Sequence, residues 1–259
     1  MATTVPENID SIMLFLTVIL VVGIVLAVMI SKYYFQRKTE PLKYLFFIFL
    51  FFMLAMIANI IGIWLHYYVY LEDVNGVMMT YEPGEGIGNY IIKLFIAYRI
   101  AFTFLIGSFY YSYKFEELIF EKEPQTKKNK LIYTFSVVTL LFTIFVYTWG
   151  GLAYDLVDFV LIALLVIFVY FPFASKAKHL YTKIEEPVYK RAIYSLFLMS
   201  LCVILQFIFF VLERIVVLMT RVGFSTFYYF AWGFGILALI TSYFGYIRPK
   251  QIAKEGNSN

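Results

Sequence analysis

Cysteine and histidine are scarce in this sequence, and their scarcity excludes several kinds of site. Cys202 is the single cysteine among 259 residues, so neither an intramolecular disulfide nor a cysteine-based metal cluster can form. The two histidines, His66 and His179, are too few for a dedicated histidine metal site. No nucleophile and base stand at a recognisable catalytic spacing either. We therefore expect no catalytic residue, no bound metal and no cofactor.

Charged side chains are also under-represented. They make up 15% of the chain, against about a quarter in soluble domains, and hydrophobic residues make up 62% instead of roughly half. A soluble core of this size cannot bury so many apolar side chains, whereas a bilayer solvates them. The formal charge of +4 does not indicate nucleic acid, because the basic residues fall in short segments between apolar runs. The sequence predicts an integral membrane protein whose main partner is the lipid bilayer.

Seven apolar runs lie between charged residues, and their lengths match membrane-spanning helices. A span takes about 20 residues, and the runs are 17 to 28 residues long. The shortest is expected to recruit the preceding turn, which holds Asp155 and Asp158. We predict an all-α polytopic membrane helical bundle, with residues 1–250 as one seven-helix transmembrane domain and residues 251–259 as a short cytoplasmic tail. The runs are 11–31, 44–71, 94–113, 131–154, 159–175, 192–212 and 222–247.

Lysine and arginine are distributed unevenly along the chain, and this sets the expected orientation. The first, third and fifth connections and the C-terminal tail hold 17 of the 21 basic residues. The N-terminal tail and the second and fourth connections hold none. Because cytoplasmic loops carry the excess of lysine and arginine, we place the N-terminus outside and the C-terminus in the cytoplasm. The sequence thus predicts a multi-pass protein of the cell membrane.

Arg99 is the least expected residue, because it lies inside the third run. An unpaired arginine inside a membrane span costs at least ~2.5 kcal/mol, so we expect Arg99 to have a partner. Asp155 and Asp158 are the best candidates, since they are three residues apart and share one face of the fifth helix. The outer half of the membrane holds further ionisable residues, namely Lys93, His66, Glu213 and Arg214.

Two interpretations of these residues stay open. In the first, they line an outward-facing polar pocket that binds a small polar ligand or an anion. In the second, they form an ion-pair set that locks the third, fifth and sixth helices together, and snorkelling explains those near the interface. Gln206, a further polar residue of the sixth helix, is expected to hydrogen-bond a neighbour. The candidate ligand-binding residues are Arg99, Asp158, Glu213, Asp155, Lys93 and His66.

Missing residues exclude other seven-helix families. Residues 222–247 contain no lysine to attach a retinal, and no Asp-Arg-Tyr closes the third helix. The chain instead resembles the seven-helix sensor regions that precede prokaryotic histidine kinases. The resemblance lies in the outside N-terminus, the basic inner loops and a seventh helix that ends YFGYIRPK at 243–250. Too few residues follow for a kinase module, so the resemblance implies an output through a separate protein.

We expect a sensor- or receptor-like protein that takes a ligand from outside and contacts a cytoplasmic protein partner. Residues 110–123 support this, because they read as a helix continuing past the membrane with Phe115, Leu118 and Ile119 on one stripe. Two alternatives stay open: a small-solute transporter or channel, and a non-catalytic subunit of a membrane complex. A transporter needs a water path inward, whereas the inner halves of the seven runs are almost wholly apolar.

Overall fold

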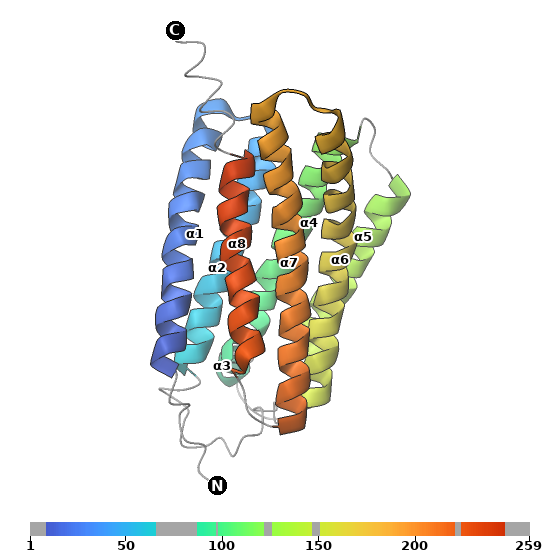
Figure 1. Cartoon of the computed structure of the whole chain (residues 1–259). Coiled ribbons are helices and arrows are strands. Elements are labelled where there is room, and N and C mark those ends of the chain that lie inside the picture. The colour runs from blue at the N-terminus through green and yellow to red at the C-terminus, as the bar shows by residue number, and fades with distance from the viewer. Residues whose placement is uncertain are drawn as a thin grey trace.

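The computed structural model describes residues 9–65, 87–96, 98–121, 126–146, 151–220 and 224–246. Within these ranges the regular elements are all helical and no strand occurs, which confirms the all-α prediction. They form an upright bundle in which the start of α1 and the end of α8 lie at opposite ends (Figure 1). The elements are α1 (Ile9–Arg37), α2 (Glu40–Trp64), α3 (Ile87–Ile96), α4 (Arg99–Phe120), α5 (Thr126–Leu141), the π-helix η2 (Phe142–Val146), α6 (Gly151–Lys183), α7 (Pro187–Thr220) and α8 (Thr226–Tyr246).

Five of the described helical stretches are long and apolar enough to cross a membrane: α1, α2, α5 with η2, α6 and α7. The bent pair α3 and α4 makes a sixth if it is counted as one span, and α8 contributes a shorter apolar stretch, Thr226–Ser242. Large apolar side chains such as Leu14, Phe171 and Met219 are exposed on the outside of the bundle, where lipid solvates them. The chain is thus a membrane-embedded multi-pass protein, while the count of seven spans and the orientation stay predictions.

α6 is the most buried of the candidate spans. It packs against α4 and, more extensively, against α7, and its middle residues Ile162, Leu165 and Val166 have no exposed surface. The helix begins at Gly151, well before the apolar run. Asp155 and Asp158 therefore lie inside the helix, as predicted from the shortness of that run. The carboxylates are consequently held on a rigid element instead of a loop.

The third predicted span, 94–113, is interrupted near the end that the sequence predicts to lie outside; we call this end of the bundle the outer end and the opposite one the inner end. α4 starts after Tyr98, whose backbone is left-handed with a φ of 62°, and the axes of α3 and α4 are bent by 67°. No proline or glycine lies at the break. The backbone instead comes very close to α2, because a Cβ added to Gly62 would lie 2.3 Å from the carbonyl oxygen of Phe95. Gly62 thus provides the space that the end of α3 occupies.

The helix predicted over 110–123 is confirmed as far as Phe120, where α4 ends. The apolar stripe predicted on it is present in part, because Leu118 and Ile119 are exposed whereas Phe115 is buried. In the same part of α4, Glu116 and Glu117 are buried in the bundle. Lys176 pairs with Glu116, and Lys114 pairs with Glu117.

Replacing Gly62 by alanine tests the close approach of α3 to α2. The added methyl group collides with the Phe95 carbonyl, so we expect Gly62→Ala to lower the free energy of unfolding by about 1–3 kcal/mol. Gly233→Ala is the matched control, because a Cβ there meets nothing within 4 Å and alanine favours the helix. Thermal melts in one detergent measure both, and equal melting temperatures for the two variants would contradict the close contact.

Candidate functional site

Arg99, the first residue of α4, has no exposed side-chain surface and is neutralised by α6. Its Nη1 donates to Oδ2 of Asp158, and its Nη2 donates to Oδ1 of Asp155 at 2.5 Å. The two aspartates lie on one face of α6, since they are three residues apart. The predicted pairing of Arg99 with both carboxylates is therefore confirmed. Two carboxylates at one guanidinium compensate the cost of removing its charge from water.

Arg214 of α7 is the fourth member of this outer ion cluster, which consists of Arg99, Asp155, Asp158 and Arg214. Its Nη1 lies 3.4 Å from Oδ2 of Asp155, and its guanidinium stacks over the ring of Phe159 at 4.6 Å from the centroid. The cluster contains two positive and two negative groups and has no net formal charge. From the sequence, Arg214 is expected at the interface, because spacing alone does not tell which of the adjacent Glu213 and Arg214 faces α6.

The π-helix η2 brings α5 to the same cluster. Thr143 donates its hydroxyl toward Oδ1 of Asp158 at 2.7 Å, and the carbonyl oxygen of Thr139 lies 2.9 Å from the same hydroxyl. Short π-helical turns are rare and often lie at functional sites. Asp158 thus holds three elements together: α4 through Arg99, η2 through Thr143, and α6 on which it lies.

Glu213 is not brought to Arg99. It is buried, and its carboxylate accepts hydrogen bonds from the hydroxyl and from the backbone N–H of Ser225, the latter at 3.1 Å. These bonds fix the start of α8 against the outer end of α7. Lys93 lies half-buried in the last turn of α3, and His66 lies outside the described residues. Of the six candidate ligand-binding residues, the structure gathers Arg99, Asp155 and Asp158.

An outer cavity of about 50 Å³ lies beside the outer ion cluster, between α2, α4, α6, α7 and α8. Arg214 and Tyr98, at the break between α3 and α4, belong to its lining. Non-helical backbone at membrane depth is tolerated where it is buried in protein or lines a water-filled cavity. The remaining lining is mostly aromatic, and it also includes the side chains of Asn59, Gln206, Tyr228 and Trp232.

The polar side chains of the outer cavity lack partners. Asn59 and Gln206 are buried, and their amides make no hydrogen bond to any described residue. The indole N–H of Trp232 and the hydroxyl of Tyr228 face each other without reaching normal hydrogen-bond geometry, and neither group has another partner among the described residues. Leaving such a buried group unpaired costs about 1–3 kcal/mol. The expectation that Gln206 bonds a neighbouring helix is therefore wrong within the described part of the chain, because its amide faces the cavity.

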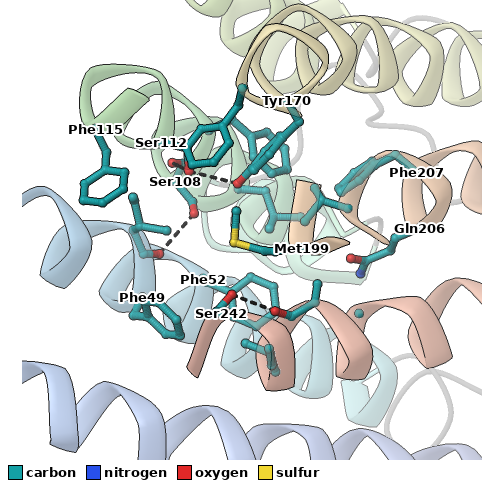
Figure 2. A pocket seen from close by; sticks show the side chains of 18 residues that line it. Phe49, Phe52, Ser108, Ser112, Phe115, Tyr170, Met199, Gln206, Phe207 and Ser242 are labelled. Atoms are coloured by element: carbon teal, nitrogen blue, oxygen red, sulfur yellow. Dashed lines mark hydrogen bonds between the residues drawn. The ribbon is translucent and has the colours of Figure 1, made fainter. Parts of the chain in front are cut away.

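An inner cavity of about 60 Å³ adjoins the outer one at Gln206 and Phe207. Figure 2 shows these two residues at one end of it and Phe115 at the other. Here the hydroxyl groups are satisfied: the hydroxyls of Ser112 and Tyr170 are 2.9 Å apart, and Ser108 donates to the carbonyl oxygen of Ile48. The two cavities thus differ in chemistry: among the described lining residues, Gln206 is the unbonded polar group that both share, and Asn59 adds a second one in the outer cavity.

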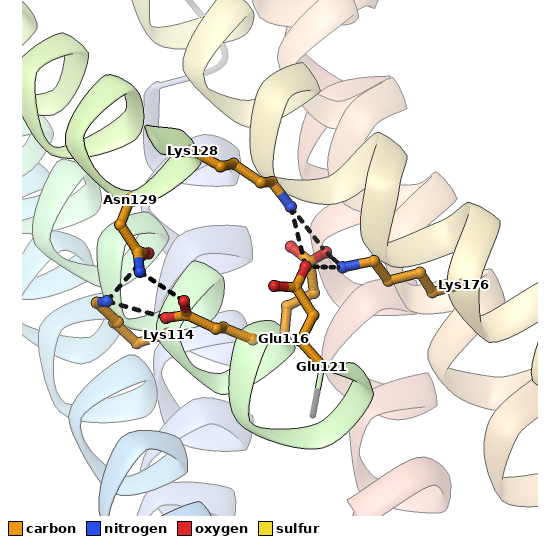
Figure 3. A network of polar contacts seen from close by, with 7 residues as sticks. Lys114, Glu116, Glu121, Lys128, Asn129 and Lys176 are labelled. Carbon is orange, nitrogen blue, oxygen red and sulfur yellow. Dashed lines mark hydrogen bonds and ion pairs between the residues drawn. The ribbon is translucent and has the colours of Figure 1, made fainter. Parts of the chain in front are cut away.

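A charged network joins α4, α5 and α6 at the inner end of the bundle (Figure 3). Glu116 has no exposed side-chain surface and lies 2.7 Å from Nζ of Lys176 and 3.4 Å from Nζ of Lys128. The same two lysines contact Glu121. Beside them, Glu117 accepts from Lys114 at 2.9 Å and from Asn129. We call these seven residues the inner charged network. The sequence does not predict this network, because its lysines read as parts of the basic connections between spans.

A double-mutant cycle tests the ion pair between Arg99 and Asp158. Arg99→Met and Asp158→Leu each leave a buried charge, so each is expected to lower the free energy of unfolding by about 3 kcal/mol or more. The double variant should lose less than the sum of the two, because it leaves neither charge of the pair behind. Lys178→Met, at an exposed position of α6, is the control and should melt like the parent. Additive losses would contradict the pairing.

Comparisons with known proteins were made for the whole chain. No protein-family model matches it, and neither a curated protein nor a solved structure is significantly similar to it. The resemblance to sensor regions of histidine kinases therefore stays a prediction. Function has to be argued from the outer ion cluster, the two cavities and the inner charged network.

Proposed function

We propose that the chain is a seven-helix, sensor- or receptor-like protein of the cell membrane, with its N-terminus outside. A ligand enters the bundle from the outer side, and the signal passes to a separate cytoplasmic protein. Five long apolar helices and the bent pair α3 and α4 can account for six crossings, and the proposal counts the shorter apolar helix α8 as the seventh. An odd number of crossings agrees with the opposite positions of the start of α1 and the end of α8 (Figure 1).

The observation that carries the proposal is the order of features along α4 and α6. Arg99 of α4 and Asp158 of α6 pair in the outer ion cluster. Further along, both helices line the cavities. One position beyond the lining residue Phe115, Glu116 of α4 pairs with Lys176 of α6. A ligand that changes the separation of α4 and α6 at the cavities therefore acts on the inner charged network, where a cytoplasmic partner has access.

A transporter or channel is the second candidate, because the two cavities adjoin at Gln206 and together extend from the outer ion cluster toward the inner charged network. A broken membrane helix such as α3 and α4 is also a frequent feature of transporter substrate sites. Against transport, the cavities are small, and the walls of the inner one are mainly apolar. Proton flux into dye-loaded proteoliposomes separates the two functions, since a sensor gives no more flux than protein-free vesicles.

Filling the outer cavity tests the coupling between the two ends of the bundle. In a Cys202→Ala background, spin labels at Lys127→Cys and Lys178→Cys report the distance between α5 and α6 at the inner end; both positions are exposed. Ala101 lines the outer cavity, and Ala101→Leu occupies its space as a ligand would. We expect the distance measured by pulsed electron spin resonance to shift by about 1–2 Å, the size of typical helix shifts.

The control for this experiment is Leu164→Phe, which enlarges an exposed side chain of α6 on the outside of the bundle. It should leave the distance between the spin labels unchanged. If Ala101→Leu folds normally and gives the same distance distribution as the parent and the control, the cavity is not coupled to the inner end, and the sensor proposal is contradicted.

A further inference from the structure

The outer cavity presents four polar side chains from three helices to one small space. Asn59 lies on α2, Gln206 on α7, and Tyr228 and Trp232 on α8. The amides of Asn59 and Gln206 make no hydrogen bond to a described residue, and Tyr228 and Trp232 face only each other, without normal hydrogen-bond geometry. We propose that this cavity is the binding site for a neutral, one-ring aromatic molecule that carries both a hydrogen-bond donor and an acceptor. The inference rests on the proposed function and names the class of ligand.

The hydrogen-bonding requirement follows from the chemistry of the four groups. The amides of Asn59 and Gln206 each offer a carbonyl acceptor and an NH₂ donor, the Tyr228 hydroxyl offers both, and the Trp232 indole offers a donor. A molecule that only accepts or only donates leaves part of this set unpaired in an apolar surrounding. A ligand with an amide, or with an equivalent pair of groups, satisfies acceptors and donors together.

The charge of the ligand follows from the outer ion cluster. Arg214 is the one ionised side chain among the described residues of the lining, and its guanidinium is already paired with Asp155. The adjacent Arg99 and Asp158 also neutralise each other. An anion or a cation in the cavity would therefore bring a charge with no counter-charge left to meet it, in surroundings where an unpaired charge is costly. A neutral ligand avoids this cost.

The walls favour a flat ring. Phe102 meets Phe159 edge-on with centroids 4.7 Å apart, and Phe210 meets Trp232 edge-on at 5.4 Å. All four rings line the outer cavity. Aromatic pairs prefer such edge-to-face or offset arrangements, so a further ring is accommodated among them more easily than a branched aliphatic group.

Gln206 controls how much space is available. A cavity of roughly 150 Å³ accepts benzene, and each of the two cavities is smaller than that, at about 50 Å³ and about 60 Å³. They adjoin at Gln206, whose Nε2 would lie 2.9 Å from a Cβ on Gly235. Because Gly235 has no side chain, the amide rests directly on α8 between the cavities. Phe52, Leu105 and Phe207 also line both cavities, so a single ring requires rotation of the Gln206 amide together with movement of these side chains.

Water is the competing occupant, since a few molecules would fill the present volume and pair with the same groups. Four probes of similar size test the charge and the hydrogen-bonding groups that the cavity requires. Benzamide is neutral with a donor and an acceptor, benzoate is its anionic analogue, benzylammonium is cationic, and toluene has no hydrogen-bonding group. Binding is measured by ligand-observed NMR on the protein in nanodiscs, with empty nanodiscs subtracted to remove partitioning into lipid. We expect saturable binding of benzamide and at least roughly tenfold weaker binding of the other three.

Two variants locate the site. Gln206→Leu and Asn59→Leu remove one amide each, so benzamide binding should fall by at least roughly tenfold, while toluene should bind more tightly than to the parent. Thr134→Leu, which makes the same kind of change at an exposed position of α5, should leave benzamide binding unchanged. The proposal is overturned if no probe binds, if all four bind equally, or if benzamide binds the Gln206 and Asn59 variants as well as the parent.

The two proposals fail in different ways. Benzamide binding that obeys these rules but does not change the spin-label distance between α5 and α6 supports the ligand site and contradicts the sensor. A distance shift in Ala101→Leu without any probe binding supports the coupling and overturns the ligand class. If water alone fills the cavity, Gln206→Leu raises the melting temperature and none of the probes shows saturable binding, which also overturns the ligand class.

Discussion

The guanidinium of Arg99 has no exposed surface, and in an apolar environment its charge has to be neutralised where it lies. This requirement brings Asp155 and Asp158 of α6 to the start of α4. The second aspartate recruits Thr143 of η2, and the first recruits Arg214 of α7. One buried charge thus determines the relative positions of four elements at the outer end of the bundle. The outer cavity lies directly beside this junction, so its shape depends on the same ion pairs.

At the inner end of the bundle, a buried charge is again neutralised by side chains of other helices, and here the cations are lysines. Glu116 is neutralised by Lys128 of α5 and Lys176 of α6. α5 buries few side chains of its own, namely Ile132, Ser136 and Thr139, so apolar packing contributes little to its position. Its contacts at the two ends are polar, at Thr143 with Asp158 and at Lys128 with Glu116. Because such contacts respond to charge and geometry more sharply than apolar packing does, α5 is the element best suited to report a change at the cavities.

Helix content and the Arg99 pairing were predictable from the sequence, because hydrophobic run length and the spacing of Asp155 and Asp158 are local properties. The break at Tyr98 was not, since no proline or glycine marks it and it coincides with a tertiary contact between the end of α3 and Gly62 of α2. The role of Arg214 was missed for a related reason: it and Glu213 are adjacent, and only helix packing decides which of them faces α6. Gln206 and Asn59 carry no sequence signal beyond being polar residues in apolar runs.

The proposed entry of the ligand depends on which end of the bundle faces outside. Mapping the membrane topology of the chain tests this most directly. Epitope tags at the N- and C-terminal ends of the chain are stained in intact and in permeabilised cells. Seven crossings with the N-terminus outside predict staining of the N-terminal tag in intact cells and of the C-terminal tag only after permeabilisation. Staining of both tags on the same side means an even number of crossings. That result, or the reverse orientation, would contradict the placement of the outer cavity on the side from which the ligand comes.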